Sequence, residues 1–538
     1  MLQAIATALV TVAIGLFGCS QSATPGTTNA ASGRHSWTIP SELRIADASE
    51  PASLNPILQT SQLETDINRL SFDVLVSADV KGEPIPMLAE TVPTTANGGI
   101  SADGLTIVYH LRKNVKWHDG KPFTSEDVAF TYHAVMNLAN NVISRTGYST
   151  IARVETPDAY TVRFHLKQRF APFVSTVFAE SDAVYCILPA HLLKGFHDLN
   201  KVAFNSLPIG TGPFKVVNWQ RGDHIEYARN DDYFLGKPTI EKIIVKFVPD
   251  TNTEYVELRA HEIDWILEAT NNSVPQLRQL PDARVVQPQS NGYLSIGFNL
   301  SHPIVSDVRV RRGISAAIDR VKINHDILHD NFPLAVADLP RFLWAFDPSL
   351  KAPAHDPALA ATLLASAGIT PQHRARLAFA TLAGNATDRA LVVQVQEALR
   401  PLGIDIDVRS AAGPLYFASA ANGGILYGGK FDLVTSSWIA GTDPDNSASY
   451  SCDAFPPKGN NLTRYCSPEM DAAQKVALSS YDRAVRKPAY AKIESLILRD
   501  VTNVFISSAG TNQAVSVDFK NFEPNPVTSV ANAYRWSI

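Results

Sequence analysis

The sequence contains few cysteines and little net charge, and both shortages exclude classes of protein. Only four of the 538 residues are cysteine, too few for a scaffold held together by disulfides. The formal net charge of −5 gives no electrostatic reason to expect a nucleic-acid partner, and we expect none. After residue 19 no segment is apolar enough to span a bilayer. The remaining composition, 45% hydrophobic, is that of a globular protein, and the length predicts two or more domains.

Two of the four cysteines lie close together in the sequence. Cys452 and Cys466 fall in a stretch rich in proline, glycine and asparagine, which we expect to form a loop. A single disulfide between them is consistent with an oxidising compartment. Spacing alone leaves a second interpretation open, in which both are unrelated buried thiols.

The amino terminus indicates export. Residues 1–18 form an uncharged apolar run that ends abruptly, which is typical of a secretory signal and short for a transmembrane helix. The sequence from Leu16 to Cys19 resembles a bacterial lipobox, although the usual preceding basic residues are missing. This resemblance implies that residues 1–19 are a signal peptide with lipobox and that Cys19 is lipidated. Residues 20–37 predict a flexible tether, so we expect a body in the periplasm or at the outer face of the inner membrane.

The stretch from Gly210 to Phe234 opens with a glycine-rich turn, GTG, that could belong to a phosphate loop or to a hairpin. A phosphate loop needs a helix after its glycines, so that amide groups point at the anion. Here a strand-like run, FKVVNW, follows the glycines, and Pro213 lacks an amide donor. A second run, HIEYAR, comes after the polar turn at 220–223. The pattern therefore predicts a β-hairpin.

Hydrophobic periodicity predicts further elements on both sides of this hairpin. Alternating residues predict strands at 106–111 and 159–166, and Thr124 is expected to cap a helix between them. Beyond residue 300 helices and strands alternate, which favours an α/β architecture. The expected elements there are a helix that Ser306 caps and that carries an apolar stripe as far as Val321, helices at 357–368 and 388–400, and strands at 404–408, 431–436 and 514–519.

Residues that could support catalysis or bind a metal form no complete set. His325 and His329 share one helical face, but no third ligand accompanies them, so exposed helix histidines are the favoured interpretation. Asp443 and Asp445 resemble a fragment of a calcium loop without its distal glutamate. Neither HExxH nor GxSxG occurs. We therefore expect no catalytic residue, no metal and no cofactor; a hydrolase or a surface adhesin lipoprotein remain alternatives of another class.

Three long segments in a fixed order resemble signatures of the extracytoplasmic solute-binding proteins of family 5, which serve peptide and nickel ABC importers. They are residues 103–130, 210–234 and 298–320. Residues 51–56 and 72–90 carry shorter similarities to the same family.

This resemblance implies an α/β protein with two hinged lobes, a type II periplasmic binding protein with an inserted subdomain. Chain crossings between the lobes would act as hinges. The implied lobe I is discontinuous and comprises residues 38–77, 205–300 and 512–538, with the inserted subdomain at 78–204 and lobe II at 301–511.

The resemblance also implies a function, namely capture of a di- or oligopeptide between the lobes. The protein would be a monomer that delivers its ligand to the permease and ATPase complex of an ABC importer, and it would not be an enzyme. Asp73 and Leu75 would lie at the cleft on the first lobe and Trp438 on the second. From the residues alone, Trp438 could equally be a core aromatic that ends a buried strand.

One position departs from the pattern of many peptide-binding relatives. These relatives carry an aspartate three residues after the tryptophan, which pairs with the ammonium group of the ligand; here the position is Gly441. Asp443 or Asp445 could substitute for the missing charge. Alternatively, the ligand lacks a free amine, as an acylated peptide, an opine-like compound or a nickel chelate would.

Overall fold

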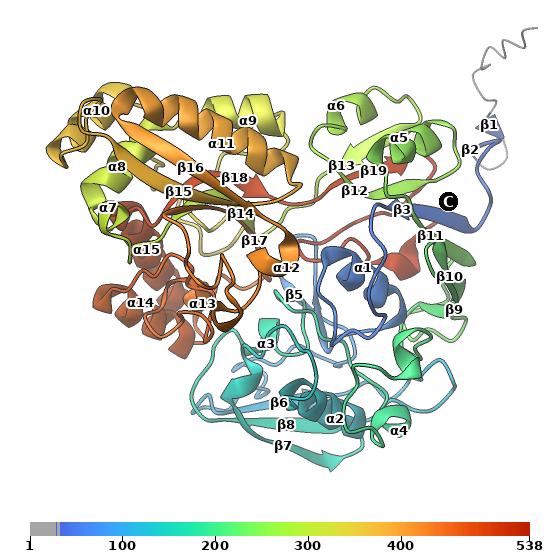
Figure 1. Cartoon of the computed structure of the whole chain (residues 1–538). Helices are drawn as coiled ribbons and strands as arrows, with labels where there is room; N and C mark the ends of the chain where they lie inside the picture. Colours follow the sequence, from blue (N-terminus) through green and yellow to red (C-terminus); the bar gives the residue numbers. More distant parts are fainter. Residues whose placement is uncertain (1–27, 30–32) are drawn as a thin grey trace, which may run out of the picture.

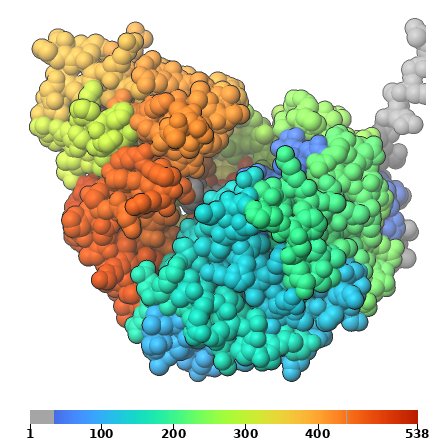
Figure 2. Space-filling model, turned by 60° about the horizontal axis from the view of Figure 1, so that its bottom comes forward, coloured from blue at the N-terminus to red at the C-terminus, as the bar shows by residue number. Residues whose placement is uncertain are grey.

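The computed structural model of the chain describes residues 28–29 and 33–538, so most of the expected signal and tether, including Cys19, lies outside the described residues. Two bodies lie side by side (Figure 1), and the space-filling view in Figure 2 shows a recess between them. Each body contains its own mixed sheet, which confirms the predicted two-lobed α/β fold class. Within the described part of the chain, every helix is too short or too polar to cross a membrane.

A seven-stranded sheet forms the centre of the first body and joins segments from both ends of the chain. Strand β3 pairs in parallel with β11 and β12, and β19 closes against β12 and β13 in antiparallel fashion. The strands in spatial order are β13 (Ala283–Val286), β19 (Asn512–Ser516), β12 (Trp265–Ala269), β3 (Glu42–Asp47), β11 (Lys242–Phe247), β10 (His224–Arg229) and β9 (Phe214–Gln220). The chain therefore returns to its first sheet at its end, as expected.

Both faces of this sheet are covered by helices. Neighbouring residues of a strand point to opposite faces, so they pack against different helices. On β3, Ile45 packs in one cluster with Leu63 and Ile67 of α1 (Gln62–Ser71). The next residue, Ala46, packs in a different cluster with Leu258 of α5 (Thr251–Arg259) and Leu277 of α6 (Val274–Leu277).

The stretch that opens with GTG forms the predicted hairpin. Strands β9 and β10 pair in antiparallel register, and residues 221–223 make the turn. The two glycines serve a close approach to the end of α1: the amide of Gly212 donates to the carbonyl oxygen of Ser71 at 2.9 Å. A methyl group on Gly210 would lie 1.7 Å from the same oxygen, which leaves no room for any side chain.

Residues between α1 and β9 build a smaller subdomain beneath the first sheet (Figure 1). Its core is a single cluster rich in aromatic side chains, among them Tyr109, Phe164 and Phe178. Thr124 precedes α2 as predicted, and its amide donates to the Asp127 carboxylate at 2.9 Å. The elements are β4 (Val76–Ala78), β5 (Pro84–Pro86), β6 (Thr106–His110), α2 (Ser125–Met136), β7 (Ile151–Asp158), β8 (Thr161–Leu166), α3 (Phe173–Thr176) and α4 (Ala190–Leu193).

The second body contains a five-stranded sheet with helices packed around it. Its strands in spatial order are β16 (Ile404–Ala411), β15 (Ala375–Leu382), β17 (Leu433–Ile439), β14 (Gly292–Phe298) and β18 (Asn503–Ala509). The helices are α7 (Pro303–Ser306), α8 (Val308–Ala317), α9 (Arg320–Leu328), α10 (Pro357–Ser366), α11 (Ala386–Leu399), α12 (Gly413–Tyr416), α13 (Ser447–Tyr450), α14 (Pro468–Ser479) and α15 (Arg483–Asp500).

Two predictions for this body need correction. Strand β14 pairs with β17 and β18, so the chain enters the second sheet at Gly292 and not after residue 300. The single helix expected between Ser306 and Val321 is three helices, because Asp307 and Asp319 each cap a new one with their side chains. Val321 consequently leaves the apolar stripe and is 64% exposed.

The close approach at Gly210 predicts a large effect of a single methyl group. We expect Gly210→Ala to lower the free energy of unfolding by roughly 3 kcal/mol or more, because the backbone of Ser71 cannot move without displacing α1. Gly195→Ala is the matched control, since an added methyl group there meets no atom within 4 Å. Urea denaturation measures both variants, and equal stability of the two would contradict this account.

Candidate functional site

The loop that follows β17 brings the second body into contact with the first. Asn291 holds this loop: its side-chain amide donates to the Gly441 carbonyl at 2.8 Å, and its backbone carbonyl accepts from the Ala440 amide at 2.7 Å. An added methyl group at Gly441 would lie 2.6 Å from the Cα atom of Ser181 in the inserted subdomain. Only a glycine at this position allows so close a contact between the two bodies.

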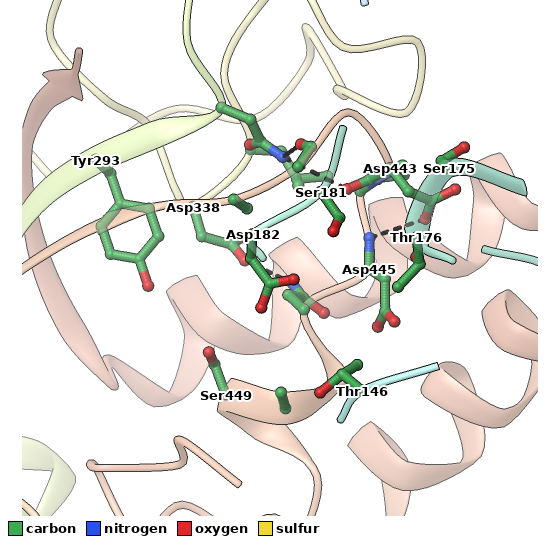
Figure 3. A pocket seen from close by; sticks show the side chains of 17 residues that line it. Thr146, Ser175, Thr176, Ser181, Asp182, Tyr293, Asp338, Asp443, Asp445 and Ser449 are labelled. Atoms are coloured by element: carbon green, nitrogen blue, oxygen red, sulfur yellow. Dashed lines mark hydrogen bonds between the residues drawn. The ribbon is translucent and has the colours of Figure 1, made fainter. Parts of the chain in front are cut away.

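A small cavity of about 60 Å³ lies at this contact. Figure 3 shows its side chains, which come from both bodies and are mostly hydroxyl and carboxylate groups. The inserted subdomain contributes Thr146, Ser175, Thr176, Ser181 and Asp182; the second body contributes Asn291, Tyr293, Asp338, Leu339, Ala440, Gly441, Asp443, Pro444, Asp445, Asn446, Ala448 and Ser449.

A much larger groove of about 1590 Å³ continues from the cavity, with which it shares Thr146, Asp445 and Ala448. One wall comes from 143–150 and 168–170 of the inserted subdomain. The other wall comes from the second body, including the loop from Ser451 to Asn460. The cavity and the groove together form one extended space between the two bodies.

A buried ion pair fixes the loop at the cavity. Both oxygens of Asp443 accept from the Arg486 guanidinium, at 2.6 and 2.9 Å, and the side chains are 10% and 6% exposed. Burial alone lowers the pKa of Arg486, but the Asp443 carboxylate outweighs it and the pKa is raised. Asp443 therefore anchors the loop, and Arg486 already balances its charge.

Three other carboxylates point into the cavity without a cationic partner. Enclosure by the surrounding protein, and then the nearby Asp445 carboxylate, raises the pKa of Asp182 to about 6, although the residue itself is exposed. Burial raises the pKa of Asp338 to about 6, against the hydrogen bond that Asn446 donates. Burial and the Asp443 charge raise the pKa of Asp445. Sequence reasoning missed Asp182 and Asp338, because no motif marks residues that meet only through tertiary packing.

The structure does not bring Asp73 and Leu75 to this site. The Asp73 carboxylate is buried within the first body, where it accepts from Thr211 at 2.9 Å and Tyr233 at 3.1 Å and lies 3.6 Å from Arg69. Leu75 is fully buried in the core of the inserted subdomain. Asp73 thus serves internal packing, and neither residue lines the cavity or the groove.

Trp438 and the two loop cysteines lie near the site. Trp438 is on β17, paired across the sheet with Tyr293 of the cavity wall. Cys452 and Cys466 form a disulfide, which closes the loop that makes part of the groove wall. The two histidines considered above as metal ligands have other partners: His325 hydrogen-bonds to Asp330, and His329 to Asn272. Among the described residues, no group of three or more metal-binding side chains is arranged around a common point.

Further contacts also join the two bodies. Arg483 of α15 forms a bidentate pair with Glu83, at 2.9 and 2.7 Å. The Tyr481 hydroxyl donates to the Gly104 carbonyl at 3.0 Å, and the Ala171 amide donates to the Leu478 carbonyl at 2.7 Å. The bodies therefore meet in a closed arrangement around the cavity.

Comparison with known proteins finds a family whose profile matches the chain and several solved structures with a similar fold. The profile of the bacterial extracellular solute-binding proteins, family 5 Middle, matches residues 83–459. The oligopeptide-binding protein AppA of Bacillus subtilis is 26% identical over 511 residues, covering 92% of this chain and 91% of its own.

Two solved structures share the fold over nearly their whole length. The structure of Bacillus subtilis AppA in complex with a nonapeptide has a TM-score of 0.77 at 25% identity and covers 92% of this chain and 98% of its own. NikZ from Campylobacter jejuni, in complex with Ni(L-His), has a TM-score of 0.78 at 25% identity and covers 93% and 100%.

The ion pair beneath the loop predicts a large cost for removing one partner. Asp443→Ala leaves the Arg486 charge buried and unpaired, so we expect the free energy of unfolding to fall by about 3 kcal/mol. The double variant Asp443→Leu/Arg486→Met removes both charges and should recover most of this loss. Denaturant titration compares them, and a single variant as stable as the wild type would refute the anchoring role.

Because Glu494 of α15 is a buried carboxyl group, we expect the stability of the protein to depend on pH. It is fully buried, and burial, followed by the Asp338 charge, raises its pKa to about 9. The folded state therefore keeps a proton that the unfolded chain releases near its usual pKa of 4.5, so this group lowers stability progressively as pH rises from 4.5 towards 9. The stability of Glu494→Gln relative to the wild type should rise by roughly 5 kcal/mol between pH 4 and pH 8. A difference that stays constant over this range would contradict the assignment.

Proposed function

This chain belongs to the bacterial extracellular solute-binding proteins of family 5, and on that premise we propose that it captures a di- or oligopeptide and delivers it to an ABC importer. The observation that carries the proposal is the extended space between the two bodies, whose walls come from both of them. A peptide enclosed there would contact both lobes at once. The AppA structure, which holds a nonapeptide, supports a ligand of this class.

Binding in this account is reversible and is coupled to closure of two lobes. We place lobe I at 38–77, 205–286 and 512–538, the inserted subdomain at 78–204, and lobe II at 292–509. The two crossings, 287–291 and 510–511, run side by side: a methyl group on Gly510 would lie 3.2 Å from the Ser290 side chain. Crossings that lie so close together can share one rotation, as a hinge requires.

The closed form would present a composite surface to the permease, so that ligand binding and docking are linked. We propose that the protein acts as a monomer, without turnover of its ligand, on the outer side of the inner membrane. Cys19 would carry the lipid anchor. Trp438 stays a proposed contact for the ligand, whereas Gly441 and Asp443 would act through the contact and the anchoring described above.

A second candidate ligand is a metal chelate or another compound without a free amine. The likeness to NikZ, whose structure holds Ni(L-His), favours this candidate. Mass spectrometry of compounds that co-purify with the native protein separates the two. Peptides should dominate, and a nickel chelate with no peptide would replace the peptide proposal.

Closure supplies a direct test of the binding mechanism. Small-angle scattering of the full chain should give a smaller radius of gyration when a peptide mixture is added than without it. Calorimetry with a peptide and its N-acetyl form then measures how far a free amine contributes. A radius that never changes, or peptide consumed during the measurement, would contradict reversible capture.

The pair between Glu83 and Arg483 predicts a remote effect on affinity. It joins the two lobes without lining the cavity or the groove, so Arg483→Ala destabilises only the closed form. We expect peptide affinity to fall by about 2- to 5-fold, the range of a single exposed ion pair. Arg374→Ala, whose pair with Asp405 lies inside lobe II, is the matched control and should bind as the wild type does. Equal affinities for both variants would exclude a latch at Glu83.

A further inference from the structure

Three of the four carboxylates of the cavity form no ion pair with any cation of the described residues. Of the described residues that line it, four are aspartates and none is lysine, arginine or histidine. Arg486 neutralises Asp443 from outside the cavity. Asp182, Asp338 and Asp445 face the same small space without such a partner (Figure 3).

Asp338 shows most directly that a partner is absent. The residue is only 5% exposed, and its Oδ2 atom accepts from the Asn446 amide. Its Oδ1 atom is buried and has no hydrogen-bond partner in the described structure. A buried carboxylate oxygen in this condition is unfavourable unless a donor from a bound molecule reaches it.

The three carboxylates come from separate segments and from both lobes. Asp182 belongs to the inserted subdomain, Asp338 to the connection between α9 and α10, and Asp445 to the loop after β17. Closing the lobes therefore brings like charges together, which opposes closure around a neutral or anionic group. Hydroxyl groups of Thr146, Ser181 and Ser449 add neutral acceptors around the same space.

We propose that Asp182, Asp338 and Asp445 bind the cationic end of the ligand and select an end group that carries two positive charges. A peptide that begins with a lysine-like residue has such an end, because its α-ammonium and side-chain ammonium lie close together. A single ammonium leaves two of the three carboxylates unbalanced, whereas a dication balances most of the charge. This proposal deepens the proposed function and rests on it for the peptide part of the ligand.

The direct test compares the tripeptide Lys-Ala-Ala with norleucine-Ala-Ala, which has the same shape without the side-chain charge. Calorimetry on the full chain should give an affinity for the lysine peptide higher by about 10-fold or more. In the triple variant Asp182→Asn/Asp338→Asn/Asp445→Asn the preference should fall below roughly 3-fold. Asp453→Asn, which removes an exposed carboxylate of the groove wall, should keep the full preference.

Thermal stability supplies a readout that a merely structural role would not give. The single variant Asp182→Asn relieves repulsion in the unliganded protein, so its melting temperature should rise by about 1–3 °C while the lysine preference falls. A lower melting temperature together with an unchanged preference would overturn the proposal, as would equal wild-type affinities for the two tripeptides.

A second arm keeps the charge proposal testable if neither tripeptide binds. Thermal shifts with 1,5-diaminopentane and with pentylamine then compare a dication with a monocation. If the diamine gives the larger shift and the triple variant loses it, the cavity binds a dication as proposed, and only the proposal of a peptide ligand is contradicted. Equal shifts, or a shift with nickel ion alone, would overturn the cavity assignment. Peptide binding without charge preference removes this inference and leaves the proposed function intact.

Discussion

The ion pair between Asp443 and Arg486 fixes the loop on which the proposed binding site depends. Arg486 comes from α15 and is buried between Trp344 and Tyr490, so its position is set by the core of the second lobe. Through Asp443 the same core positions the backbone from Ala440 to Asn446. This segment touches Ser181 at Gly441 and turns Asp445 into the cavity. A rigid helix in one lobe thus determines where that lobe meets the other.

Local patterns in the sequence were sufficient for most individual elements. Alternation predicted β6 and β8, and the absence of a helix after GTG predicted the hairpin of β9 and β10. Asp356 before Pro357 correctly marked the start of α10, where its side chain accepts from the Leu359 amide. These features depend on neighbours within a few residues, and the sequence contains that information directly.

Features that depend on distant residues could not be predicted in the same way. The carboxylates of Asp182, Asp338 and Asp445 lie far apart in the chain and gain a common environment only through packing. Asp73 has the charge expected of a cleft residue, but its carboxylate accepts hydrogen bonds from Thr211 and Tyr233 within the first lobe. Strand β14 is buried along its whole length, so its pattern did not indicate which sheet it joins.

The central claim is that a ligand is enclosed between the lobes with its positive end among the three free carboxylates. A crystal structure of the full chain with bound Lys-Ala-Ala tests it most directly. The account predicts that the peptide occupies the cavity and the start of the groove, with an ammonium nitrogen within hydrogen-bond distance of Asp338 Oδ1. A peptide bound elsewhere, or one whose positive end points away from Asp182, Asp338 and Asp445, would contradict it.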